Sequence, residues 1–195
     1  MTEHVRVSFD DEPLILVGAD DEPVGFETKQ RCHEGEGIRH RAFSVFLFDA
    51  AGNVLLQQRS AQKRLWPLVW SNACCSHPRR GESVADAVAR RLREELGVAD
   101  ATTYLFKFEY HARYRDLGAE HELCHVYVGR QRSPLRLNAN EIAAVRVCTP
   151  AELDREIESR ADAYSPWLDL EWRRMRSSHW PAVEAALQAL CHPAG

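Results

Sequence analysis

Short apolar segments separated by turn residues dominate the first two thirds of the chain. The turns at 18–23 and 49–53 combine Gly with Asp, Asn or Pro. Each turn lies between two apolar segments, which is typical of a β-hairpin. We predict strands at 14–17, 24–28, 44–48, 54–58, 104–111, 121–129 and 143–148.

Helical patterns begin in the middle of the chain. Ser83 is suited to cap a helix over 84–96, and Gly97 is suited to end it. The apolar residues of this segment recur at every fourth position, as on one face of a helix: Val84, Val88, Leu92 and Leu96. One internal amphipathic helix is therefore predicted between the strands.

The C-terminal third is predicted to be mainly helical. Thr149 and Glu152 form a capping-box pattern that starts a helix ending near 160. Ser165 precedes a proline that opens a final helix, and we expect Pro181 to interrupt it. Strands followed by helices predict an α/β (α+β) fold in which helices cover a sheet.

Composition narrows the class of protein. With 195 residues, 45% of them hydrophobic and 28% charged, the chain suits one globular domain over 1–195. A net charge of −4 argues against a nucleic-acid partner. We expect no membrane association, because no apolar run approaches the ~18 residues of a membrane span. Without a secretion signal, we expect a cytoplasmic protein whose six cysteines are free thiols.

Several residues of metal-ligand type stand apart from these elements. His33 and His40 are seven positions apart, His77 follows a pair of cysteines, and Glu120 and Glu122 alternate along a predicted strand. The period of a strand places both carboxylates on one face and His121 on the other. Three imidazoles with two carboxylates suit Zn²⁺, Mn²⁺ or Mg²⁺. Spacing alone leaves open that these are ordinary surface histidines.

The segment 70–97 carries the most specific motif. It contains Asn72-x-Cys-Cys-Ser-His-Pro and ends in Arg90-x-x-x-Glu-Glu-x-Gly. The ending resembles a Nudix box, and the lead-in resembles type I isopentenyl-diphosphate isomerases, which use the Nudix fold and a metal. The resemblance implies a Nudix-like mixed sheet flanked by helices, with an N-terminal extension, a helical C-terminus and a catalytic core at about 29–170.

The resemblance also implies an activity. Isomerases of this family interconvert isopentenyl and dimethylallyl diphosphate in isoprenoid biosynthesis, by protonation and deprotonation through a carbocation. It implies a small diphosphate substrate, a monomer, Mg²⁺ and a second divalent ion, which could be Mn²⁺, Zn²⁺ or Mg²⁺. We expect no flavin and no nicotinamide, and the sequence has no Gly-x-Gly-x-x-Gly signature.

Family positions assign provisional roles to residues of this chain. The second divalent ion would be bound by His33, His40, His77, Glu120 and Glu122. Glu95 corresponds to the residue associated with a substrate-bound Mg²⁺. The diphosphate contacts would be Lys29, Arg59, Lys63 and Arg91. The catalytic residues would be Cys75, Glu122 and Tyr110, while Trp167 would cover the hydrocarbon and stabilise a cation.

A Nudix pyrophosphohydrolase acting on a small organic diphosphate is the alternative. Arg91 stands where those enzymes carry a glutamate, and Ser76 where they carry a glycine. The lost carboxylate weakens this alternative, because hydrolases collect negative charge there to bind several metal ions. A metal- or phosphate-binding domain with a degenerate box is a third interpretation. We interpret Glu94 as a helix ion-pair residue and Cys74 as a packed apolar residue.

Overall fold

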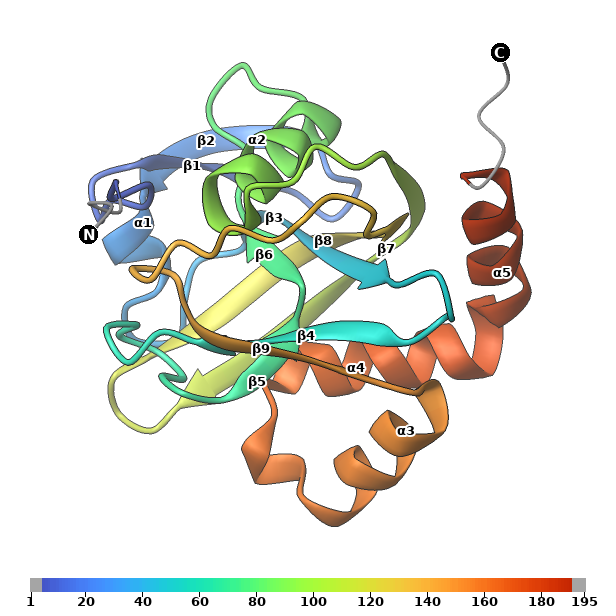
Figure 1. Cartoon of the computed structure of the whole chain (residues 1–195). Helices are drawn as coiled ribbons and strands as arrows, with labels where there is room; N and C mark the ends of the chain where they lie inside the picture. The colour runs from blue at the N-terminus through green and yellow to red at the C-terminus, as the bar shows by residue number, and fades with distance from the viewer. Residues whose placement is uncertain (1–4, 191–195) are drawn as a thin grey trace.

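The computed structural model describes residues 5–190, and a mixed sheet of nine strands forms its centre (Figure 1). The strands are β1 (Pro13–Val17), β2 (Pro23–Thr28), β3 (His40–Phe48), β4 (Val54–Arg59), β5 (Trp70–Asn72), β6 (Cys74–Ser76), β7 (Thr102–Tyr114), β8 (Gly118–Arg130) and β9 (Ile142–Cys148). The helices are α1 (Lys29–Cys32), α2 (Val84–Leu96), α3 (Pro150–Ser159), α4 (Pro166–Arg174) and α5 (Trp180–Ala189), with a short 3₁₀ turn η1 (Ala161–Ala163) and a π-helical turn η2 (Met175–His179). The predicted mixed fold is confirmed.

A parallel pairing between β3 and β8 organises the sheet. Its register runs from His40 opposite Glu122 to Phe48 opposite Arg130. β7 pairs with β8 in the antiparallel direction and places Tyr110 opposite Glu122. The register therefore brings three residues of predicted function to the same rows of the sheet.

Two strands were missed by the sequence analysis. β5 pairs with β4, and β6 pairs with β3, where Ser44 lies opposite Cys75. Each has only three residues, which is too short to show an alternating pattern. The Cys-Cys-Ser motif is therefore a strand at the centre of the sheet.

The central strand β3 is buried on both faces of the sheet. Phe43 and Leu47 of β3 pack with Leu92 of α2 in one apolar cluster. Phe46 and Phe48, on the opposite side of β3, pack in a second cluster with helices α3, α4 and α5. Figure 1 shows α2 on one side of the sheet and the C-terminal helices on the other. The alternation of β3 thus supplies both cores.

The helix boundaries follow the sequence signals closely. Ser83 accepts a hydrogen bond from the backbone of Asp86, and Gly97 ends α2 with a φ of 70°. The final helix changes to a π-helical turn at 175–179, just before Pro181. Proline cannot donate the intrahelical hydrogen bond of its position, so the regular pattern breaks there. Among the described residues, no helix is long and apolar enough to span a membrane.

Candidate active site

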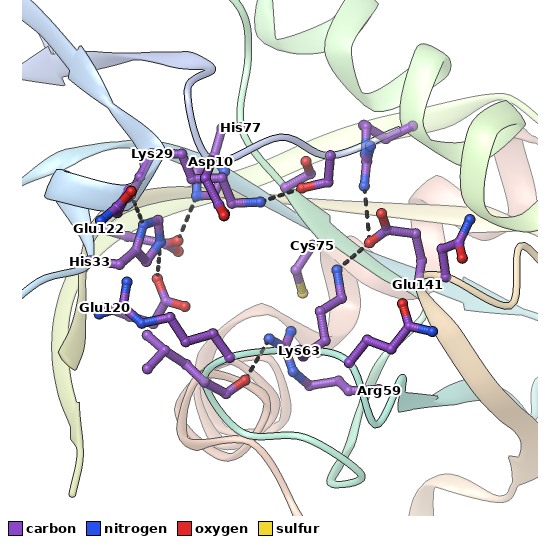
Figure 2. Close-up of a pocket in the computed structure, with 18 of the residues that line it drawn as sticks. Asp10, Lys29, His33, Arg59, Lys63, Cys75, His77, Glu120, Glu122 and Glu141 are labelled. Atoms are coloured by element: carbon purple, nitrogen blue, oxygen red, sulfur yellow. Dashed lines mark hydrogen bonds and ion pairs between the residues drawn. The ribbon is translucent and has the colours of Figure 1, made fainter. Parts of the chain in front are cut away.

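A cavity of ≈ 490 Å³ lies at the end of the sheet where β3, β6 and β8 meet. In Figure 2, His33, Glu120 and Glu122 lie on one side of it, Lys63 and Glu141 on the other, and Cys75 between them. Metal-ligand groups, a thiol and cations therefore line one and the same cavity.

The five predicted metal ligands converge. Their ligand atoms lie within 4.8 Å of one another: His33, His40, His77, Glu120 and Glu122. His33 follows α1, His40 begins β3, and His77 follows β6, so the cluster joins segments that are far apart in the sequence. His121 faces Glu109 outside the cluster, as the strand period predicted.

Backbone carbonyls fix two of the three imidazoles, those of His33 and His40, in a metal-binding tautomer. Nδ1 of His33 lies 2.6 Å from the carbonyl oxygen of Lys29, and Nδ1 of His40 lies 2.7 Å from that of Ile38. A carbonyl only accepts, so each Nδ1 donates and the neutral ring keeps a lone pair on Nε2. Nε2 of His33 lies 2.7 Å from Glu120 Oε2, a buried oxygen for which the described residues offer no other hydrogen-bond donor. Converging lone pairs and carboxylates fit a divalent metal ion.

The electrostatics differ among the imidazoles: burial opposes protonation of His33, but the adjacent Glu120 carboxylate outweighs it and raises the pKa of His33. Burial and the neighbouring His40 and His33 hold the pKa of His77 well below its ordinary value, which favours a neutral ligand. Burial opposes ionisation of Glu122, but the nearby His40 and the hydroxyl of Tyr110 outweigh it and lower its pKa. The Tyr110 hydroxyl donates to Glu122 Oε2 at 2.7 Å. Glu122 is therefore a carboxylate bonded to a phenol.

Cys75 presents a neutral thiol to the cavity. Burial, followed by the charge that Glu171 carries once it is ionised, raises its pKa to about 12. Its S–H donates to Asn72 Oδ1 at 2.8 Å, and the Asn72 amide is oriented by the carbonyls of Val45 and Cys74. Nothing in the sequence identifies Asn72 as a partner of the thiol, although it begins the motif.

Cations collect on the far side of the cavity. Lys63 pairs with Glu141, Arg91 approaches Glu141 at 3.5 Å, and Lys29 donates to Ser8. Burial, with Lys63 and Arg91 nearby, lowers the pKa of Lys29 to about 8. The three cations face the buried carboxylate of Glu141, and Arg91 also pairs with Glu95 behind the wall. Cations outnumber carboxylates among the residues that line this side of the cavity, which favours binding of an anion. Glu141 was not predicted, because it follows a loop without a motif.

Arg59 lies against Trp167. Its guanidinium carbon is 5.0 Å from the centroid of the indole ring, and its N–H groups donate to the carbonyls of Trp66 and Leu65. Trp167 lines the cavity and donates through Nε1 to Ser71 Oγ at 2.9 Å. Both predicted substrate contacts therefore border the same cavity.

Glu95 lies behind the cavity wall. It is 3% exposed and does not line the cavity, whereas Arg91 does. An Arg91 nitrogen lies 2.7 Å from Glu95 Oε1, and the Cys74 thiol lies 3.5 Å from the same oxygen. Glu94 pairs with Arg90 and Arg91, as the helix ion-pair interpretation predicted. The structure thus brings every predicted site residue except Glu95 to the cavity or its cluster.

Comparisons with known proteins place this chain in a family. The NUDIX domain family matches residues 38–168. The "Isopentenyl-diphosphate Delta-isomerase 1" of Photorhabdus laumondii is 37% identical over 87% of this chain and 97% of its own length. The isopentenyl-diphosphate Delta-isomerase of Nocardia farcinica is 45% identical over 80% of this chain and 90% of its own length.

Solved structures show the same fold. The DR0079 protein of Deinococcus radiodurans superimposes with a TM-score of 0.69 at 27% identity, over 84% of this chain and 98% of its own. A MutT protein of Methanosarcina mazei superimposes with a TM-score of 0.57 at 14% identity, over 72% of this chain and 96% of its own, which supports the fold alone. The predicted Nudix fold is therefore confirmed, and the chain belongs to the isopentenyl-diphosphate Delta-isomerase family of NUDIX domain proteins.

Proposed function

We propose that this protein interconverts isopentenyl and dimethylallyl diphosphate in isoprenoid biosynthesis. The observation that carries the proposal is one cavity that holds the Cys75 thiol, the Tyr110–Glu122 pair and a cluster of cations. Family membership supports the same activity, because the relatives named above are isopentenyl-diphosphate Delta-isomerases.

The reaction moves a carbon–carbon double bond by two proton transfers. A proton is added to the terminal alkene carbon, and another is removed from the carbon next to the diphosphate-bearing carbon, with a tertiary carbocation between the steps. Cys75 and the Tyr110–Glu122 pair are the two proton carriers in this proposal. One adds the proton and the other removes it, and the roles exchange in the reverse direction.

The remaining residues would bind and shield the substrate. Lys29, Lys63 and Arg91 would bind the diphosphate oxygens, with Arg59 beside them. Glu141 would release Lys63 and Arg91 as the diphosphate arrives. The face of Trp167 would stabilise the carbocation by a cation–π interaction.

The five-residue cluster would hold a divalent ion as described above. Such an ion would act as a Lewis acid that fixes the Glu122 carboxylate and stabilises negative charge beside the hydrocarbon. We retain the prediction that Glu95 binds substrate-bound Mg²⁺. Arg91 would then have to leave Glu95 and bind the diphosphate instead. Several expectations stay predictions: the identity of the cluster metal (Mn²⁺, Zn²⁺ or Mg²⁺), the monomeric state, the cytoplasmic location, the single domain over 1–195 and its core at 29–170.

The alternative, a pyrophosphohydrolase, lacks support from the charges of α2. Arg91 is 3% exposed and forms a buried ion pair with Glu95. This pair neutralises the face of the helix on which a hydrolase would need several free carboxylates to bind its metal ions. Cys75 would also have no role in hydrolysis.

An assay of both possible products tests the proposal. Protein loaded with Mg²⁺ and Mn²⁺ is incubated with isopentenyl diphosphate, and the allylic isomer and released phosphate are measured together. We expect the allylic isomer to form without phosphate release. Release of phosphate or pyrophosphate without isomer would replace this proposal with the hydrolase.

A further inference from the structure

A carboxyl group is buried directly behind the cavity. Glu171 of α4 is 0% exposed and does not line the cavity. One carboxyl oxygen, Oε1, lies 3.4 Å from the Cys124 thiol, and the other, Oε2, is buried without a partner. Within residues 5–190, no Lys, Arg or His pairs with it. An unpaired buried carboxylate is costly, so a neutral carboxyl suits this site.

Ser44 connects this carboxyl to the thiol of the cavity. Its Oγ lies 3.5 Å from the Cys124 thiol, which is itself 3.4 Å from Glu171 Oε1, so the Ser44 hydroxyl and the carboxyl share one buried site and interact there. Ser44 Oγ also lies 3.4 Å from Cys75 Sγ, across the β3–β6 pairing. The thiol proton of Cys75 is already directed at Asn72, so Cys75 can only accept from Ser44. Ser44 has one hydroxyl proton and two acceptors that compete for it, Cys75 and an ionised Glu171.

We propose that Glu171, as a neutral carboxyl, is a positioning residue that donates to Ser44 and thereby directs the Ser44 hydroxyl at the sulfur of Cys75. The inference rests on the proposed function, since it assigns Cys75 to proton transfer. When Glu171 ionises, the Ser44 proton turns to the carboxylate and the sulfur loses its donor. Negative charge that develops on the sulfur is then no longer stabilised by a hydrogen bond.

The surroundings give the direction of the pH dependence. The groups facing Glu171 are Cys124 and Glu122 of β8, Cys75 of β6 and the uncharged Ser44 of β3. Burial is the largest cause that raises the pKa of Glu171, to about 8, and Glu122 adds to it. Glu171 is therefore neutral below this pH, and kcat should fall as the pH rises through about 8. The pKa of Lys29 lies in the same range. Because Lys29 would bind the diphosphate, its titration should affect kcat/KM, which reports ionisable groups of the free enzyme.

Matched variants separate this role from a structural one. Glu171→Gln keeps the shape and a permanent N–H donor, so kcat at pH 7 should stay within about threefold and the fall above pH 8 should disappear. Glu171→Leu and Ser44→Ala should each lower kcat about tenfold to a hundredfold with little change in KM, and the double variant should lose no more than either alone. Asp169→Asn is the control, because it also replaces a carboxylate by an amide on α4 but at a partly exposed position, and it should behave as wild type.

Two outcomes in the variants would overturn the proposal. One is an alkaline fall in kcat that persists in Glu171→Gln, and the other is an unchanged kcat in Glu171→Leu. The Leu variant should fold, because it replaces an unpaired carboxyl in an apolar site, and thermal unfolding checks this.

Infrared spectroscopy tests the inference without turnover. A carbonyl band of a neutral carboxylic acid, assigned by its loss in Glu171→Gln, should be present at pH 6 and disappear with a midpoint near 8. The S–H band assigned by Cys75→Ala should shift in Ser44→Ala. An inactive wild-type protein would refute the proposed function, while absence of the carboxylic acid band at pH 6 would refute the role of Glu171.

Discussion

At the residue scale, two adjacent cysteines have opposite environments. Successive side chains of a strand point to opposite faces, so Cys75 lines the cavity while Cys74 is buried in the apolar cluster under α2. The difference follows from the strand β6 and not from any chemical distinction between the two residues.

Replacing each cysteine tests this division. Cys75→Ala should lower kcat about 10²- to 10⁴-fold, as loss of an acid–base group does, with an unchanged circular dichroism spectrum. Cys74→Ala should keep its activity and lose about 1 kcal/mol of stability in urea unfolding. Steady-state kinetics decide the matter, and a near-normal rate for Cys75→Ala would exclude it as a proton carrier.

Trp167 allows a similar comparison. Both Trp167→Phe and Trp167→Leu lose the Nε1 hydrogen bond to Ser71, so the difference between them isolates the aromatic ring. If the ring stabilises a carbocation by about 2 kcal/mol, kcat of the Leu variant should be roughly thirtyfold below that of the Phe variant. Equal kcat values would mean that Trp167 only fills space. Effects on KM would instead report the Arg59 side chain that lies over the ring.

At the scale of elements, the start of β8 positions a metal ligand. Gly118 has a φ of +150°, and a Cβ there would lie 2.0 Å from the carbonyl oxygen of His33. The next residue, Ala119, donates its backbone N–H to that same oxygen at 3.2 Å. The segment carrying His33 can therefore approach β8 only because residue 118 has no side chain.

Gly118→Ala should displace His33 from the cluster. We expect affinity for Mn²⁺ or Zn²⁺ in titration calorimetry to fall about 10- to 100-fold, in the range seen when ligand positioning is lost. Gly52→Ala is the control, because Gly52 also has a positive φ but no atom lies within 4 Å of its added Cβ. Unchanged affinity in Gly118→Ala would show that His33 is positioned by other contacts.

The elements also show what the sequence can predict. Strands β7, β8 and β9 and helix α2 have enough residues for their alternation or period to be recognised. The pairing of β3 with β8 could not be predicted, because nothing in either strand specifies a parallel partner that is distant in the sequence. Glu141 and Glu171 were missed for a related reason. Each is an ordinary glutamate in sequence and becomes unusual only through burial.

At the scale of the whole molecule, the metal cluster joins separate parts of the fold. Its five residues come from the segment after α1, from β3, from the segment after β6 and from β8. Spacing identified suitable ligand types but could not show that residues 33 and 120 lie together. The family resemblance supplied that expectation, and the structure shows the convergence.

Metal binding should therefore stabilise the folded chain. An ion present at 100 times its dissociation constant adds about 2.7 kcal/mol when it binds only the folded state. Thermal unfolding with Mn²⁺ or Zn²⁺ should occur at higher temperature than with EDTA. The increment should vanish in His77→Ala, and an equal increment in that variant would place the ion elsewhere.

The most direct test of the account follows carbon-bound hydrogens and phosphorus by NMR during incubation with isopentenyl diphosphate in D₂O. We predict formation of the allylic isomer with deuterium incorporated into its hydrocarbon and with its diphosphate intact. With Cys75→Ala, neither isomer formation nor deuterium incorporation should be detected over the same incubation. Conversion that leaves the hydrocarbon free of deuterium, or phosphate release with the double bond unmoved, would contradict the account.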